Sequence, residues 1–530
     1  MNTTMDWTLP YDTRRMPVCA ANTVATSQPL AATAAIDVLR DGGNAVDAAI
    51  AAAMALTVVE PCSNGIGGDA FALVHDGTRL HGLNASGRAP RAWSIERFAG
   101  HDRMPTLGWD AVTVPGAVSG WAALSQRFGT MPLTRLAQAA CAYARDGFPV
   151  SPQAANSWER ARHRYESCPQ WQQTFAAQGR APRAGERFAC PAQAETLEAI
   201  AASNGADFYT GDLARRIVEA AAAEGGAIDA TDLANHEPLW VEPLSIPYRD
   251  RMLHELPPNG QGLVPLVAAA LLDRFDVSMH EPDDPALLHL QIESIKHAFA
   301  LCKPELGCPD SMRRTPESIL DPKQLDAIAA TIAPDAAHDP GHVVVTDAST
   351  VYLAVGDANG MMVSYIQSNY MGFGSGIVVP DTGIAMQNRG AGFVLEPGHP
   401  NAVAGGRRPY HTIIPGFISH NGAPETSFGV MGGHMQPQGH LQVLSHLVDA
   451  GRNPQAALDA PRWRIDQGCR VHLEPGFSSA TVDGLRERGH DIQNAGERSV
   501  AFGGGQIVQR VEADYVAGSD ARRDGLALGR

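Results

Sequence analysis

Two short apolar runs separated by a polar turn form the clearest pattern in this chain. Val351–Val355 is a continuous apolar run, and Met361–Ile366 is a second, mostly apolar one. The segment between them contains Asn359-Gly360, a pair typical of tight hairpin turns. The pattern therefore predicts an antiparallel hairpin that begins at Thr350. With the turn centred on Asn359, Thr350 faces Ser368 across the ladder, with Cβ atoms about 5 Å apart.

The rest of the pattern predicts helices with fewer strands. Asn44 is expected to cap a helix over Ala45–Val58, and a glycine-rich turn precedes a strand over Phe71–Val74. Residues 120–330 are mainly helical in pattern, and a late strand is expected at Gly383–Gln387. Further expected helices are Thr33–Leu39, Leu133–Ala144, Ala194–Ala202, Asp212–Ala223, Leu263–Leu272 and Leu441–Ala450. The pattern favours one large unit with both helices and sheets, or two to three ordinary domains.

Composition narrows the classes of partner. The chain has 530 residues, is 44% hydrophobic and 18% charged, and has a formal net charge of -16. An acidic protein of this kind is not expected to bind nucleic acid or an anionic membrane surface, because such binding requires neutralisation of phosphates. A small-molecule substrate fits better.

The termini and cysteines suggest a cytoplasmic protein without cofactor or metal. The N-terminus lacks the basic and apolar regions of a signal peptide. The longest apolar stretch, Ala45–Val59, is short for a membrane span and contains Asp47. Eight cysteines are scattered without a CxxC pair, which predicts free thiols.

Several blocks of the chain together resemble the γ-glutamyltranspeptidase family. They include the run Thr350–Gly360, the glycine-rich Gly372–Gly376, the segment Gly42–Ile50 and the loop Gly65–Gly68, and similar blocks occur in order from about residue 22 to residue 524. The resemblance implies an α+β fold, the four-layer αββα sandwich of N-terminal nucleophile hydrolases. It also implies a precursor that cuts itself, giving a large subunit 1–349 and a small subunit 350–530.

The resemblance assigns the chemistry to a few positions. Cleavage between Ser349 and Thr350 would leave a hydroxyl and a free α-amine on one residue, so that the nucleophile and its general base arrive together. Gly432 and Gly433 match the glycines that line the family's oxyanion hole. Ser368 matches the residue that hydrogen-bonds the nucleophile, and the hairpin register reaches the same residue independently.

The substrate-binding positions depart from the transpeptidase pattern. By resemblance they are Ser86, Arg88, Tyr370, Arg389, Gly392, His411 and Thr412. Ser86 stands where the family has the arginine that grips the substrate α-carboxylate, and Gly392 stands where it has an acid. Arg389 replaces a neutral amide. A cation without a nearby acid disfavours a substrate ammonium and favours a carboxylate.

The resulting hypothesis is a self-processing amide hydrolase or acyltransferase for γ-glutamyl-like or other small carboxylate-bearing amides. An alternative is an amidohydrolase for substrates without the α-amine, such as oxamate or glutaryl and cephalosporin amides. An alternative of another class is a binding protein that has lost processing, although Thr350, Gly432 and Gly433 are intact. The expected partners are a small-molecule amide and the two subunits of one precursor, and a homodimer of heterodimers is one assembly that this allows.

Overall fold

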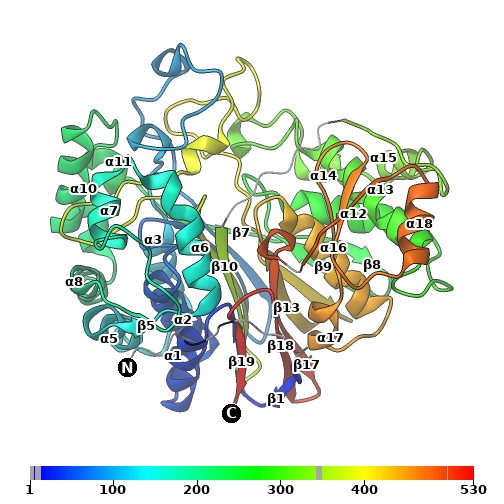
Figure 1. Cartoon of the computed structure of the whole chain (residues 1–530), viewed down its shortest axis with the longest axis horizontal. Helices are drawn as coiled ribbons and strands as arrows, with labels where there is room; N and C mark the ends of the chain where they lie inside the picture. The colour runs from blue at the N-terminus through cyan, green and yellow to red at the C-terminus, as the bar shows by residue number, and fades with distance from the viewer. Residues whose placement is uncertain (1–4, 6, 8–13, 342–348, 498) are drawn as a thin grey trace.

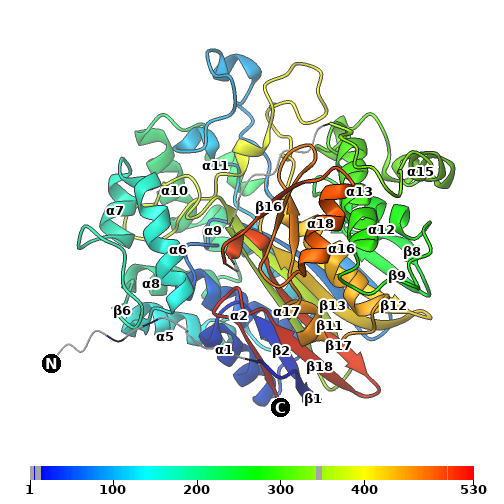
Figure 2. The ribbon, with the colours of Figure 1, turned by 45° about the vertical axis from the view of Figure 1, so that its right-hand side comes forward.

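Two seven-stranded β-sheets lie face to face at the centre of the molecule, and helices cover the outer face of each (Figure 1). This computed structural model describes residues 5, 7, 14–341, 349–497 and 499–530. The order of the layers is helix, sheet, sheet, helix, and it remains visible when the molecule is turned (Figure 2). The expected four-layer αββα sandwich is confirmed.

The first sheet holds the predicted hairpin at its centre. Its strand order is β19-β2-β10-β11-β3-β4-β7, and every neighbouring pair is antiparallel. The strands are β2 (Thr23–Thr26), β3 (Asp69–His75), β4 (Leu80–Ala85), β7 (Leu239–Val241), β10 (Ser349–Gly356), β11 (Met362–Tyr370) and β19 (Leu526–Gly529). The carboxyl-terminal strand β19 therefore joins the same sheet as the hairpin.

The second sheet is also antiparallel and supplies the loops opposite the hairpin. Its strand order is β1-β18-β17-β13-β12-β9-β8. The strands are β1 (Val18–Ala20), β8 (Leu244–Tyr248), β9 (Arg251–Glu255), β12 (Gly416–His420), β13 (Ala423–Met431), β17 (Gly504–Val511) and β18 (Asp514–Ser519). Strand β13 ends at the two glycines expected to form the oxyanion hole.

Helices from the first half of the chain cover the hairpin sheet, and later helices cover the other sheet (Figure 1). The first layer contains α1 (Pro29–Arg40), α2 (Ala45–Val59), α3 (Ala117–Phe128), α5 (Gln138–Asp146), α8 (Pro191–Ala202) and α10 (Asp212–Ala223). The second contains α12 (Leu263–Leu272), α13 (Pro285–Cys302), α16 (Met435–Val448), α17 (Pro454–Asp459) and α18 (Ser479–Glu487). Each layer buries one outer sheet face.

Burial on both faces explains why β10 is a continuous apolar run and not an alternating one. Val351, Leu353 and Val355 pack against the first helical layer, whereas Tyr352 and Ala354 point into the core between the sheets. Side chains alternate along a strand, so a strand covered on both sides needs apolar residues at every position.

Helix α2 is buried along its whole length and starts where the sequence predicts. Every residue of α2 is buried. The Asn44 side chain accepts a hydrogen bond from the Asp47 backbone N–H, and the Asp47 carboxylate accepts one from the Asn44 N–H, which completes a capping box. Asp47 also accepts hydrogen bonds from Thr130. The buried Asp47 carboxylate is therefore compensated by hydrogen-bond donors.

No helix of the described chain is long and apolar enough to cross a membrane.

Two expected elements are divided or missing in the structure, and several expected helices begin earlier, for example α16 at Met435 in place of Leu441. The helix expected at Leu133–Ala144 is divided into α4 (Leu133–Leu136) and α5. The strand expected at Gly383–Gln387 forms only isolated bridges, at Ala385 and Met386, because its partners there are single residues of irregular loops. The apolar pattern identified a buried segment but not a strand partner.

Candidate active site

A β-bulge in β11 lies opposite Thr350 at the start of β10. Val351 pairs with Gln367, as the predicted register requires, but Ser349 pairs with Tyr370, one position out of step. The extra residue is on β11, where Ser368 and Asn369 together lie opposite Thr350, and bulges of this kind re-aim a side chain. Thr350 Oγ1 donates a hydrogen bond to Ser368 Oγ at 3.3 Å. The predicted meeting of these two hydroxyls is confirmed.

Ser368 links the nucleophile candidate to the bond expected to be cut. Its hydroxyl donates to the carbonyl oxygen of Ser349 at 2.8 Å, and it accepts from the Tyr370 backbone N–H at 2.8 Å. The Nη2 of Arg389 also donates to Ser368 Oγ, at 3.2 Å. A hydroxyl whose oxygen is held by donors is a stronger donor in turn, so the Ser349 carbonyl is polarised at the bond that precedes Thr350.

Arg389 is a buried cation next to this hydroxyl pair. The side chain is 1% exposed, and its Nη1 donates to Thr412 Oγ1 at 2.9 Å. Its guanidinium lies 4.3 Å from the centre of the Tyr370 ring, a cation–π contact. Burial lowers the pKa of Arg389 to about 10, which leaves it protonated at neutral pH. Its Nε has no hydrogen-bond partner among the described residues.

A buried carboxylate that the sequence analysis did not identify lies nearby. Asp69 opens strand β3 opposite Ser368, and its Oδ2 is 3.1 Å from Nε2 of His411. The Nδ1 of His411 accepts from the Ile413 N–H, so the ring is neutral and donates to Asp69. Burial raises the pKa of the Asp69 carboxyl to about 7, against the opposing charge of Arg389. A carboxylate placed directly after Gly67-Gly68 at the head of an apolar strand is the signal that could have revealed it.

His411 and Thr412 therefore have different surroundings, although the resemblance pairs them as substrate ligands. Thr412 contacts Arg389 directly, whereas both ring nitrogens of His411 already have partners within the protein. Burial lowers the pKa of His411 well below its usual value. His411 donates a hydrogen bond to Asp69, and neither of its ring nitrogens is left to bind a ligand.

Gly432 and Gly433 form the turn between β13 and α16. Their φ angles are +125° and +60°, in the region that favours glycine. Among the described residues, neither backbone N–H has an acceptor, whereas the Gly433 carbonyl accepts from Gln261 Nε2 at 2.9 Å. Two free N–H groups on a turn fixed through its carbonyl are suited to stabilise an oxyanion.

Three other predicted substrate residues do not contact this group. Ser86 Oγ donates to Asn84 Oδ1 at 2.7 Å, and Arg88 Nη1 donates to the Gly406 carbonyl at 2.7 Å. The Gly392 carbonyl accepts from Asn401 Nδ2 at 2.6 Å. Their roles in substrate binding stay predictions that no contact with Thr350 or Arg389 supports.

A cavity of about 500 Å³ opens onto Ser349, the residue before Thr350. Ser349 and Gly432 lie in its wall, together with Met371 and Gly372 from the end of β11. Thr350 is buried, and its chain neighbour Ser349 connects it to this cavity. Arg389 is enclosed and does not line the cavity.

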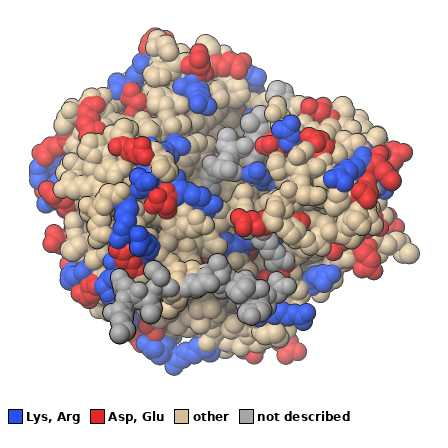
Figure 3. Space-filling view, in the orientation of Figure 1, with Lys and Arg blue, Asp and Glu red and all other residues tan. Residues whose placement is uncertain are grey.

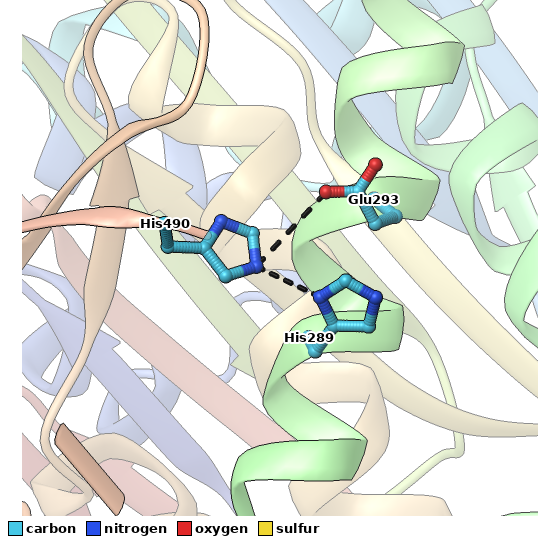
Figure 4. Close-up of side chains that lie close together, drawn as sticks. All are labelled: His289, Glu293 and His490. Carbon is cyan, nitrogen blue, oxygen red and sulfur yellow. Dashed lines mark hydrogen bonds and ion pairs between the residues drawn. The ribbon is translucent and has the colours of Figure 1, made fainter. Parts of the chain in front are cut away.

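A separate polar group lies between α13 and the C-terminal segment. His289, Glu293 and His490 converge there (Figure 4), an arrangement of ligand types that is also found in metal sites. However, His289 Nδ1 and His490 Nε2 already lie 2.8 Å apart in a hydrogen bond, and Lys296 Nζ lies 2.5 Å from Glu293 Oε1. The side-chain ammonium of Lys296 therefore already supplies the positive charge that a metal ion would bring to Glu293. We assign this group a structural role, in which it joins α13 to the segment around His490.

The αββα sandwich, a threonine hydroxyl at the head of a central strand and free N–H donors on the turn after β13 define an amidohydrolase of the N-terminal nucleophile class. The gamma-glutamyltranspeptidase family model matches residues 31–529, and the chain belongs to this family. Its relatives are named hydrolases, and the chain is an enzyme of this type.

Three relatives illustrate the range of the family. The oxamate amidohydrolase proenzyme of Klebsiella pneumoniae subsp. pneumoniae is 36% identical, over 94% of this chain and 97% of its own length. The glutathione hydrolase-like YwrD proenzyme of Bacillus subtilis is 34% identical, over 96% and 98%. The crystal structure of a cephalosporin acylase from Bacillus halodurans superimposes with a TM-score of 0.95 at 46% identity, covering 99% of both chains.

Proposed function

We propose that this enzyme hydrolyses the amide bond of a small acyl donor that carries a carboxylate and lacks an α-amine. The observation that carries the proposal is the protonated, enclosed Arg389, which lies two hydrogen bonds, of 3.3 and 3.2 Å, from Thr350 Oγ1. A guanidinium binds a carboxylate through parallel hydrogen bonds and repels an ammonium. Relatives named as an oxamate amidohydrolase and a cephalosporin acylase support this substrate class over γ-glutamyl compounds.

The short path from Thr350 to Arg389 favours a short acyl group. The substrate carbonyl must lie about 3 Å from the nucleophile for attack. If a carboxylate of the same substrate accepts hydrogen bonds from Arg389, only a few covalent bonds separate that carboxylate from the carbonyl. Oxamate satisfies this easily, and a glutaryl group does so when it folds back.

In the proposed reaction, Thr350 Oγ1 attacks the amide carbon and its own α-amine takes the hydroxyl proton. The N–H groups of Gly432 and Gly433 stabilise the oxyanion, the amine then leaves with the proton, and water hydrolyses the acyl ester. Ser368 positions the nucleophile by accepting a hydrogen bond from Thr350 Oγ1.

The free α-amine requires self-cleavage between Ser349 and Thr350, which is part of the proposal. Thr350 Oγ1 attacks the Ser349 carbonyl carbon, and the C–N bond breaks as an ester forms, with the hydroxyl proton passing to the nitrogen that becomes the free α-amine. Water then hydrolyses the ester, which releases the Ser349 carboxylate and restores the Thr350 hydroxyl. Splitting the 56.2-kDa chain of 530 residues after residue 349 gives fragments of about 37 and 19 kDa. Thr350→Ala should leave one uncut, inactive band on a denaturing gel, and an active wild-type protein that stays uncut would refute this mechanism.

Matched anilides test the substrate class. A glutaryl and a γ-glutamyl anilide differ only in the α-amine, and wild type should show the higher kcat/KM for the glutaryl compound. Arg389→Lys keeps the charge but loses the paired hydrogen bonds, so it should narrow the gap chiefly by raising KM for the glutaryl compound. A clear wild-type preference for the γ-glutamyl anilide would restore the glutathione hydrolase hypothesis.

A further inference from the structure

Three arginine side chains line the cavity beside Ser349. Arg160 at the end of α6 (Pro152–Arg162), Arg164 in the following turn η3 (His163–Tyr165), and Arg523 before β19 all border the cavity. None of the described residues in its wall is acidic. Basic side chains gather over α6 beside the central hollow of this face (Figure 3).

The charges of these arginines have little compensation inside the protein. Arg160 Nη2 lies 3.4 Å from Ser157 Oγ, and Arg164 Nη2 lies 3.4 Å from the Thr106 carbonyl oxygen. Neither forms an ion pair with a carboxylate of the described chain. Arginines on a surface are often simply solvated, so Arg160 and Arg164 alone do not indicate an anion-binding site. The third arginine, Arg523, is buried and gives the stronger indication.

Arg523 is the strongest sign that the wall is built for an anion. Its side chain is 7% exposed, and its Nε has no hydrogen-bond partner among the described residues. The carboxylate next to it is that of Glu60, with 3.9 Å between Arg523 Nη1 and Glu60 Oε1. Burial raises the pKa of Glu60 to about 7, so this acid neutralises Arg523 only in part at neutral pH. A buried and incompletely paired guanidinium is costly unless a ligand completes it.

The geometry assigns this wall to the amine half of the substrate. In the proposed function Arg389 binds the acyl half, and this cavity, which Ser349 lines, is left for the amine half. We propose that Arg160, Arg164 and Arg523 bind a second carboxylate, on the leaving amine, so that the natural substrate is an amide with an anionic group on each side of the scissile bond. This rests on the proposed function.

The dimensions and lining of the cavity describe that amine further. About 500 Å³ accommodates a group of amino-acid or dipeptide size. Met371, Tyr165 and Val500 add apolar surface to the same wall. The favoured leaving group is therefore an amino acid or aminoaryl acid with an apolar body and a terminal carboxylate.

A pair of leaving groups of nearly equal size tests the inference. Glutaryl amides of 4-aminobenzoate and of 4-aminobenzamide differ in a single negative charge on the amine half. Wild type should prefer the aminobenzoate amide at least tenfold in kcat/KM, mainly through KM, and about 0.5 M NaCl should reduce the preference. The double variant Arg160→Gln/Arg164→Gln should remove most of it. The measured quantity is the kcat/KM ratio of the two amides. Comparing this ratio between wild type and variant removes the difference in intrinsic reactivity between the two amides.

Arg162→Gln is the matched control. Arg162 is in the same helix but pairs with Glu159 at 3.1 Å and does not line the cavity, so this variant should keep the wild-type ratio. If wild type hydrolyses both amides with the same ratio as the double variant, the inference is wrong while the proposed function stands.

If wild type hydrolyses neither amide, the glutaryl donor fails, and calorimetry with the free amines decides the inference separately. Wild type should bind 4-aminobenzoate at least tenfold more tightly than 4-aminobenzamide, and the double variant should bind them alike. Equal binding of both amines by wild type would overturn the second carboxylate site.

Discussion

Replacing Ser368 by alanine removes one hydroxyl that serves two steps of the proposed chemistry. In the uncut chain it donates to the Ser349 carbonyl at 2.8 Å and accepts from Thr350 Oγ1 at 3.3 Å. It also accepts from Arg389 Nη2 at 3.2 Å. Ser368→Ala should therefore slow self-cleavage and, once the chain is cut, slow turnover.

The size of the effect follows from which contacts are lost. The contact with Thr350 fixes the rotamer of the reacting hydroxyl, and its loss should lower kcat by about ten- to a thousandfold, or about 1.4–4 kcal/mol of barrier. Arg389 keeps its hydrogen bond to Thr412, so substrate binding should change less and KM should stay within about threefold. Self-cleavage should slow by a similar factor because the Ser349 carbonyl loses a donor.

Ser364→Ala is the matched control, because Ser364 lies on the same strand, is equally buried and also loses hydrogen bonds. Its hydroxyl contacts the Tyr352 hydroxyl at 2.7 Å and the Phe428 carbonyl at 3.3 Å, away from the nucleophile. Gel densitometry over time after expression gives the rate of cleavage, and steady-state kinetics on the cut protein separates kcat from KM. An effect of Ser368→Ala confined to KM, or equal losses of kcat in both variants, would refute the positioning role.

Two further predictions concern pH and stability. Because the pKa of Asp69 is raised to about 7, its carboxyl is neutral below that pH and negative above it, where it opposes a substrate carboxylate at Arg389. KM for an anionic substrate should therefore rise as the pH increases through 7, and Asp69→Asn should flatten this dependence; a wild-type KM independent of pH from 6 to 8 would contradict it. Asp47 accepts hydrogen bonds from the N–H groups of Asn44 and Thr130, so Asp47→Ala should lower the free energy of unfolding by about 2–4 kcal/mol in urea titrations. Asp37 is only partly buried and pairs with Arg40 at the surface, so Asp37→Ala should cost less than about 0.5 kcal/mol. A loss of stability no larger than that of Asp37→Ala would show that the capping network contributes little.

Local sequence determined the elements whose partners are close along the chain. The Asn359-Gly360 turn and the two apolar runs establish the hairpin, because a hairpin's register depends on its turn. Helix α2 followed from its cap at Asn44, and α10 and α12 were predicted with their observed bounds. The meeting of Thr350 and Ser368 belongs to this local level.

Tertiary structure decided the surroundings of the nucleophile. Asp69 and His411 are separated by 342 residues, and Arg389 and Thr412 by 23, so no turn or period connects either pair. The resemblance could place Arg389 at a substrate position, but only the packing of the two sheets shows that it is enclosed against Ser368. The cavity wall likewise joins α6 to the turn before β19. A site assembled from distant segments is set by how buried faces pack, and the pattern along one chain shows which residues are buried but not which of them meet.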